Sequence, residues 1–121
     1  MTIAFWVVAA LLALAFLGAG TMKLIRSKQS LAGAGMAWTE DFSARAVKAI
    51  GAVEVVGAVG VLVPVLTGVA PILSPIAAVG LALTMVGAIV VHARRKESAT
   101  PAVVLLVLGV AAAALGFLFV A

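Results

Sequence analysis

From Ala49 to Val91 the chain carries a single charged residue, Glu54, and the stretches 2–22 and 101–121 carry none. A helix rises 1.5 Å per residue, so about 20 apolar residues cross a hydrocarbon core of about 30 Å. The central stretch is too long for one crossing and too short for three, whereas each outer stretch fits one. The sequence therefore predicts an all-α integral membrane protein, a four-helix bundle of up-and-down topology in a lipid bilayer.

The composition supports this fold class and excludes several functions. Hydrophobic residues make up 66% of the 121 residues and charged residues 10%, whereas soluble domains are about one quarter charged. The chain has no cysteine, which excludes disulfides, thiol chemistry and iron–sulfur ligation. One histidine and four carboxylates are too few for the usual protein-only metal sites, so we expect no metal. The basic residues flank the predicted spans, so we expect no nucleic-acid partner.

Prolines and glycines divide the apolar sequence into spans. Pro64, Gly68 and Pro71 mark the break in the central stretch, since proline removes a backbone donor and glycine tolerates turns. We therefore expect Pro64 to end or kink the second span and Pro101 to open the last one. A secretory signal is the alternative for the first span, but basic residues follow that span instead of preceding it. The predicted spans, within one domain of residues 1–121, are 2–22, 46–66, 71–91 and 102–120.

The basic residues also predict the orientation of the spans. All eight Lys and Arg residues fall within 23–48 or 92–100, and the connection 67–70 has none. Basic loops stay on the cytoplasmic side of a membrane. We therefore expect both basic loops in the cytoplasm and both termini outside, in a bacterial-type inner membrane.

The connection between the first two spans is predicted to hold an interfacial helical segment. The run 30–38 is only weakly polar, which suits a segment that lies on the membrane surface. Thr39 is the expected N-cap of a helix whose first turn holds Glu40 and Asp41. Asp41 and Arg45 are four residues apart, so we expect them to pair on that helix. The second span then continues from this helix into the membrane.

Glu54 is the most informative residue of the membrane segments. A carboxylate at this depth costs about 2–3 kcal/mol unless it is paired, protonated or hydrated. Gly51, Gly57 and Ala58 share its helical face at spacings of three and four, so another helix can approach that face closely. We therefore expect Glu54 to point into the bundle.

Three basic or titratable residues are expected near the depth of Glu54. The cytoplasmic ends of the spans are neighbours in an up-and-down bundle, which brings Lys23, His92 and Arg94 towards one layer. Lys23 is long enough to reach the carboxylate, and His92 is able to donate to it or to titrate near neutral pH. One interpretation is a binding pocket for a quinone, a lipid headgroup or a proton. The other is a buried ion pair that fixes the register of the helices.

Three segments of the chain follow one another in a distinctive order. They are Gly20-Thr-Met-Lys23, then Ile50-Gly51-Ala-Val-Glu54-Val-Val-Gly57-Ala-Val-Gly60-Val-Leu-Val-Pro64, then Met85-Val-Gly-Ala88 leading to His92. In this order and spacing they resemble the DoxX-like family of small four-helix membrane proteins, over nearly the whole chain. The positions marked by the family pattern are Gly20, Lys23, Gly51, Glu54, Gly57, Pro64 and His92.

The resemblance implies several functions. Members of the family are linked to a thiosulfate:quinone oxidoreductase, to membrane-associated oxidoreductase complexes with soluble enzymes and, in distant animal relatives, to receptor-assembly chaperoning. Because this chain lacks cysteine, a redox role would need a bound quinone or the cofactor of a partner.

Three classes of function remain in competition. We favour a non-catalytic accessory or anchoring subunit of a membrane-associated, quinone-linked redox complex. It would have a membrane or cytoplasmic protein partner, and would hold a quinone or lipid beside Lys23, Glu54 and His92. The alternative is a proton-coupled transporter resembling the small multidrug-resistance exporters, with Glu54 as the proton site. The third class, an intrinsic enzyme, would need the polar cluster to transform a quinone. The oligomeric state stays open, and a homo-oligomer is compatible with the sequence.

Overall fold

A computed structural model gives the fold of residues 2–120. The chain forms four long helices and two short ones, and the described residues contain no strand. Each long helix is long and apolar enough to cross a membrane, which confirms the predicted all-α four-helix membrane bundle. The elements are α1 (Ile3–Ile25), α2 (Lys28–Gly33), the 3-10 helix η1 (Ala37–Asp41), α3 (Ala44–Thr67), α4 (Leu73–Arg94) and α5 (Thr100–Val120).

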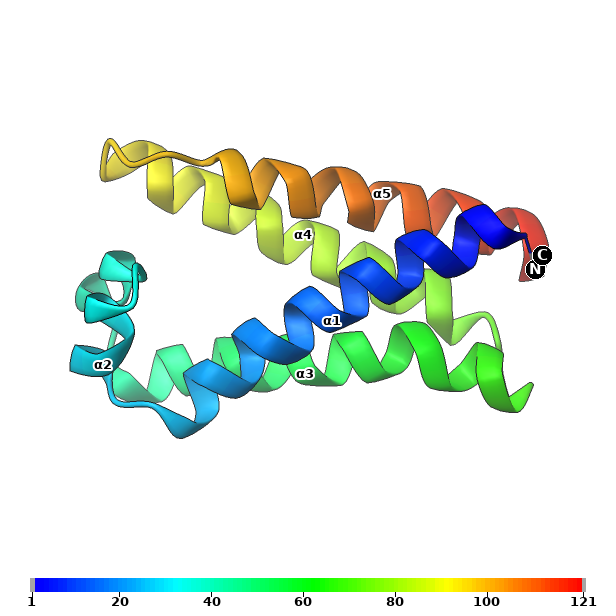
Figure 1. Cartoon of the computed structure of the whole chain (residues 1–121), viewed down its shortest axis with the longest axis horizontal. Coiled ribbons are helices and arrows are strands. Elements are labelled where there is room, and N and C mark those ends of the chain that lie inside the picture. The colour runs from blue at the N-terminus through cyan, green and yellow to red at the C-terminus, as the bar shows by residue number, and fades with distance from the viewer. Residues whose placement is uncertain (1, 121) are drawn as a thin grey trace.

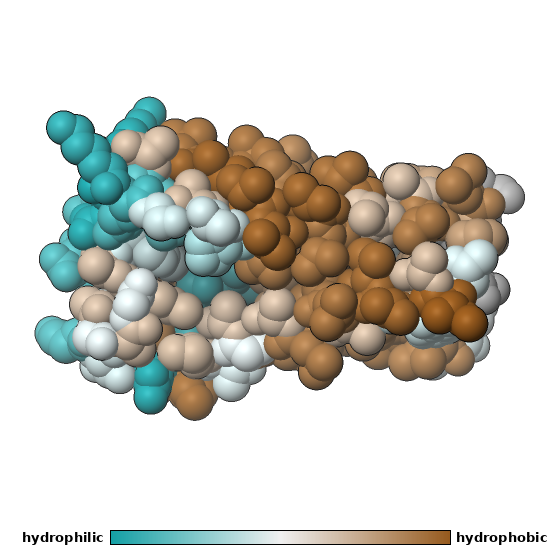
Figure 2. Space-filling model, turned by 45° about the horizontal axis from the view of Figure 1, so that its top comes forward, coloured by the Kyte–Doolittle hydropathy of each residue, from teal (hydrophilic) through white to brown (hydrophobic). Residues whose placement is uncertain are grey.

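The long helices run up and down, with both termini at one end of the bundle (Figure 1). The most extensive contacts join α1 to α3 and α4 to α5, and further contacts join α3 to α4 and α1 to α5. The two pairs diverge towards the end that carries α2 and η1 (Figure 1). Hydrophilic side chains gather at this end, whereas the rest of the visible surface is mostly apolar (Figure 2). We call it the polar end.

Large side chains from α1 fill the space between the helices. Phe5, Leu12 and Phe16 are fully buried, and they share one core with Val61 of α3 and Leu81 of α4. Spacings of seven and four residues put the three α1 side chains on one helical stripe. The outer faces of the helices carry exposed valine and leucine side chains. This pattern fits a bundle whose surroundings are lipid, because lipid tails are as apolar as leucine.

Glycines bring α1 and α3 into close contact near the polar end. A Cβ atom on Gly51 would lie 2.7 Å from the Cβ atom of Lys23 and 2.8 Å from the carbonyl oxygen of Gly20. A Cβ atom on Gly20 would in turn lie 2.8 Å from the carbonyl oxygen of Gly51. Gly57 faces α4, where a Cβ atom would lie 2.6 Å from Cδ2 of Leu81, an atom at the end of a flexible side chain. Residues without a side chain are needed where α1 and α3 cross, because an added Cβ atom there would meet the backbone.

Of the two outcomes predicted for Pro64, an end of the second span is wrong, because α3 continues to Thr67; a kink of the helix at this residue stays a prediction. The proline lies near the C-terminal end of the helix, so few backbone hydrogen bonds remain beyond it. In the turn before it, Ser74 of α4 donates a hydrogen bond from Oγ to the carbonyl oxygen of Val61, at 2.6 Å. The helix ends instead at Gly68, whose φ of 73° is the left-handed conformation typical of glycine after a helix.

The second span also begins at a different residue from the one predicted. Thr39 lies in η1 and does not cap α3, since its hydroxyl donates to the carbonyl oxygen of Met36 at 2.8 Å. Ser43 caps α3, and its hydroxyl accepts a hydrogen bond from the backbone N–H of Ala46 at 3.1 Å. Serine and threonine are both good N-cap residues. The sequence pattern therefore could not choose between these two positions.

We expect Gly51→Ala to destabilise the bundle. The added methyl group would overlap the side chain of Lys23 and the backbone of Gly20, and overpacking of this kind costs about 1–3 kcal/mol. Thermal unfolding in detergent, followed by circular dichroism, measures the effect. Gly18→Ala is the matched control, because a Cβ atom there meets no atom within 4 Å. Equal melting temperatures for the two variants would contradict the close crossing of α1 and α3.

Candidate functional site

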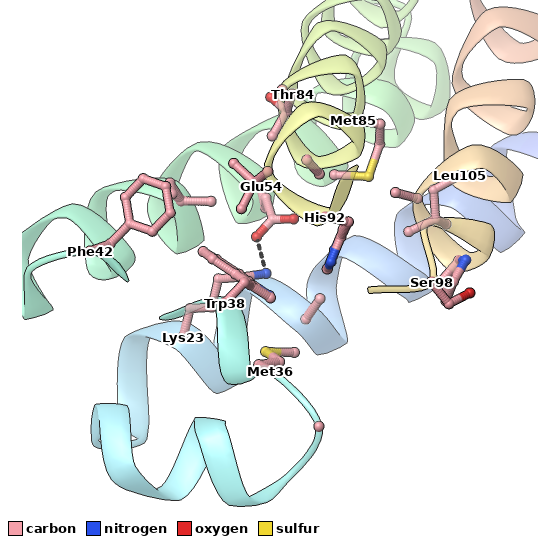
Figure 3. A pocket seen from close by; sticks show the side chains of 18 of the residues that line it. Lys23, Met36, Trp38, Phe42, Glu54, Thr84, Met85, His92, Ser98 and Leu105 are labelled. Atoms are coloured by element: carbon pink, nitrogen blue, oxygen red, sulfur yellow. Dashed lines mark hydrogen bonds and ion pairs between the residues drawn. The ribbon is translucent and has the colours of Figure 1, made fainter. Parts of the chain in front are cut away.

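A cavity of about 600 Å³ lies at the polar end, with walls from α1, α3, α4 and α5. Figure 3 shows the side chains that line it. Most of the lining is apolar, and the segment 34–42, which includes η1, contributes to the wall on the side of the short elements. A cavity of this volume suits a small organic ligand, since such sites typically measure about 300–1,000 Å³.

Lys23 and Glu54 form a buried ion pair in the wall of this cavity (Figure 3). Lys23 Nζ donates to Glu54 Oε1 at 2.6 Å, and the two side chains are 6% and 2% exposed. The close crossing at Gly20 and Gly51 places the two side chains opposite each other. In Figure 3 the second carboxylate oxygen of Glu54 points away from Lys23, towards the side of His92. The structure thus brings together two of the residues singled out in the sequence.

Aromatic side chains of the 34–42 segment lie beside the ion pair. Lys23 Nζ is 5.6 Å from the centroid of the Trp38 ring, which is within the range of a cation–π interaction. Trp38 packs edge to face against Phe42, with their ring centroids 5.7 Å apart. Gly35 has a φ of 98°, a conformation that favours glycine, and it lies where the chain turns between α2 and η1. The turn therefore helps to bring Trp38 over the lysine.

A second polar cluster connects α4, the loop that follows it and η1. His92 Nδ1 lies 3.1 Å from Glu97 Oε1, and Arg95 Nε donates to Glu97 Oε2 at 3.1 Å. Arg95 Nη1 also lies 2.8 Å from Asp41 Oδ2. This ion pair joins the segment beside the cavity to the connection between α4 and α5.

Of the two roles predicted for His92, donation to Glu54 does not match the structure. His92 lines the cavity, but its ring contacts Glu97 and not Glu54. Arg94 is exposed and takes part in no ion pair within residues 2–120. Arg95, the next residue along the chain, makes the charged contacts instead.

The predicted pairing of Asp41 is also wrong. Asp41 contacts Arg95 and not Arg45. The reason is that Asp41 belongs to η1 whereas Arg45 belongs to α3, and Phe42 between them is extended. The spacing of four residues brings side chains together only within one helix.

Four residues at or near the cavity were not predicted as site residues from the sequence, and all of them lie in connections between spans. They are Trp38, Asp41, Arg95 and Glu97. One signal was present: Glu97 is an acidic residue directly after three basic ones, which suggests a local ion pair. Nothing in the spacing indicated that η1 would reach the loop after α4.

The arrangement is a mostly apolar cavity whose wall holds the donor Lys23 and the acceptor Glu54 beside further polar side chains, which are Trp38, Thr84, His92 and Ser98. The ammonium group of Lys23 has three N–H donors, and one of them is used by Glu54. The carboxylate of Glu54 has acceptor positions beyond the one that Lys23 occupies. Within the part of the chain that the structure describes, no cluster of three histidine or acidic side chains could hold a metal ion. The site is therefore suited to hydrogen bonding with an organic ligand.

The fold and the cavity define a small four-helix integral membrane protein with a ligand-sized site at one end of the bundle. The model of the DoxX-like family matches residues 7–117, so the chain belongs to this family. The family suggested by the sequence motifs is thus confirmed. Comparison with curated proteins and with solved structures gave no match.

We expect Lys23→Met to lower the melting temperature in detergent markedly. The substitution leaves the carboxylate of Glu54 buried without its partner, and breaking a buried ion pair costs about 3–5 kcal/mol. The double variant Lys23→Met, Glu54→Gln should recover much of the loss, since neither residue then carries a charge. A double variant as unstable as the single one would show that the pair does not hold the fold.

A pH dependence is expected from the cluster around Glu97. The pKa of Glu97 lies below its ordinary value of 4.5, chiefly because Arg95 donates a hydrogen bond to its carboxylate, with a smaller contribution from His92. Because the folded-state pKa is lowered, ionised Glu97 stabilises the fold above pH 4.5, and this stabilisation is lost as the pH falls through the folded-state pKa. Glu97→Gln should therefore melt below the unaltered protein at neutral pH, and the two should converge in acid. A difference in melting temperature that does not change with pH would contradict this.

Proposed function

We propose that the protein is a non-catalytic accessory subunit that holds a quinone in the membrane beside a partner enzyme. The observation that carries the proposal is the cavity, which is mostly apolar and has the Lys23–Glu54 pair in its wall. A quinone has carbonyl oxygens that accept hydrogen bonds, and its reduced form has hydroxyl groups that donate them. A wall with both a donor and an acceptor suits both forms.

The charges around the cavity favour a quinone over a lipid headgroup. Lys23 and Glu54 cancel each other, and Arg95 contacts both Asp41 and Glu97 nearby, so this cluster has no spare positive charge. A phosphate group would bring a further negative charge towards Glu54, and burying a charge without a partner is costly. A quinone brings no charge, so the site can take it without a further cation.

The connections between the spans support an accessory role. Within the described residues they hold no helix beyond the short elements α2 and η1, and the chain has no cysteine and therefore no thiol redox couple. In this proposal the electrons for the quinone come from the cofactor of a partner. The partner would meet the polar end, because the cavity and the loops that surround it lie there.

The ion pair counts against a proton-coupled transporter. A carboxylate that carries protons has to gain and lose its proton in every cycle. Glu54 is held by Lys23 at 2.6 Å, and protonation of the carboxylate would leave the lysine as an uncompensated charge in a buried site. We therefore place transport second.

We further propose that the polar end faces the cytoplasm of a bacterial-type cell and that both termini lie outside. The chain contains no cysteine, so single cysteines can be labelled without a background. An impermeant thiol reagent on intact spheroplasts should label Thr67→Cys, and it should label Ser27→Cys and Ser98→Cys only after the membrane is opened. Labelling of Ser27→Cys or Ser98→Cys in intact spheroplasts would reverse the orientation.

Quinone binding can be measured with the two tryptophans of the chain, Trp6 and Trp38. Quinones quench tryptophan fluorescence at short range. In Trp6→Phe the remaining indole lines the cavity, so a short-chain ubiquinone should quench it saturably. Trp38→Phe is the matched control, because Trp6 lies near the other end of α1, about 25 Å from Lys23. Equal quenching in both variants, or none in Trp6→Phe, would contradict the proposal.

A further inference from the structure

A second hollow, of about 510 Å³, runs along the outside of the seam between α3 and α4. Every residue that lines it is apolar. Val53 and Val56 on α3 and Ile76 on α4 form exposed parts of its walls, with exposed fractions of 55%, 70% and 51%. At Gly80 the lining of the hollow has no side chain, and a Cβ atom there would meet no atom within 4 Å. We call this hollow the seam groove.

The seam groove adjoins the cavity. On α3 the groove reaches Val53, and Ile50, three residues earlier on the same side of the helix, lines the cavity. On α4 the groove reaches Gly80, and Thr84, one turn or about 5.4 Å further, lines the cavity. Gly87 lies at the edge of the cavity, and a Cβ atom there would also meet nothing within 4 Å. The two hollows therefore lie end to end along the seam between α3 and α4, and Thr84 stands between Gly80 and Gly87 on the same side of α4.

The polar groups at this junction are already satisfied within the helix. Thr84 Oγ1 donates to the carbonyl oxygen of Gly80 at 2.9 Å, so its hydroxyl proton already has an acceptor and does not need one from a ligand in the seam groove. From Leu73 to Gly87 the path along α4 is about 20 Å long at 1.5 Å per residue. The groove therefore extends the apolar lining of the cavity along the seam towards the other end of the bundle.

We propose that the seam groove holds the tail of the molecule whose head occupies the cavity, and that this ligand has one long apolar chain of the polyprenyl type. The inference rests on the proposed function, since it requires an uncharged head beside Lys23 and Glu54. The end-to-end arrangement of the two hollows along one seam is what selects this occupant. One groove that leads away from the cavity suits one tail better than the paired acyl chains of a phospholipid.

Binding of two quinones to the protein in lipid nanodiscs tests the proposal. One is the tail-less benzoquinone head and the other is the same head with a tetraprenyl tail, each followed by quenching of Trp38 in the Trp6→Phe background. With concentrations expressed per lipid, we expect the tailed quinone to bind about fivefold more tightly, because the tail gains packing contacts in the groove. Gly80→Phe, which fills the groove, should remove this preference and leave the binding of the tail-less head unchanged.

Gly18→Phe on α1 is the matched control. This glycine is also exposed and also has no atom within 4 Å of a Cβ position, but it lines neither hollow. It should keep the full preference for the tail. A preference that survives in Gly80→Phe would overturn the inference while leaving the proposed function intact, whereas failure of both quinones to bind would overturn both. A changed oligomeric mass of Gly80→Phe with no change in tail preference would assign the groove to a second copy, and would also overturn the inference.

Photo-crosslinking keeps the test independent of any substitution. A quinone with a diazirine at the far end of its tail should form adducts on Val56, Leu73 or Ile76, which line the groove. It should not react equally with Leu14 of α1 or Val107 of α5, which are exposed outside both hollows. An even spread of adducts over these faces would contradict the inference. An equal yield in the groove from a phospholipid with the same diazirine would contradict it as well.

Discussion

The close crossing of α1 and α3 at Gly20 and Gly51 determines much of what surrounds it. Because neither residue has a side chain, the two backbones approach until Lys23 stands directly opposite Glu54. A carboxylate inside a membrane needs such a partner, so the crossing and the ion pair depend on each other. The same crossing holds α1 and α3 together at the polar end, where α4 and α5 diverge from them and the cavity opens.

The parts of the fold that could be predicted are those that the membrane itself dictates. Apolar length gave the number of helices, and the small residues around Glu54 indicated which face it would present. Lys23 could be assigned as a partner because its chain is long and few other cations lie at that depth. Helix ends were harder to place, since Thr39 and Ser43 compete as caps and a proline near the end of α3 is tolerated.

The contacts outside the spans could not be predicted from the sequence. Water can satisfy polar groups in connections, so no strong penalty selects one partner for Asp41 or His92 over another. Their actual partners, Arg95 and Glu97, are set by how η1 folds back between the helix pairs. The cavity was likewise beyond sequence analysis, because its volume depends on the angle at which the two pairs diverge and not on any one residue.

Asp41 of the 34–42 segment and its ion-pair partner Arg95 belong to different halves of the bundle. The segment follows α1, whereas Arg95 follows α4, and Asp41 joins the two. The Asp41–Arg95 distance therefore reports how far the α1–α3 pair stands from the α4–α5 pair. A ligand that moves the two helix pairs apart weakens the Asp41–Arg95 contact. By thermodynamic reciprocity, a protein that binds both connections and holds them together weakens the binding of that ligand. Under the proposed function, a partner that stays outside the membrane would therefore bind the filled and the empty forms of the bundle with different affinities.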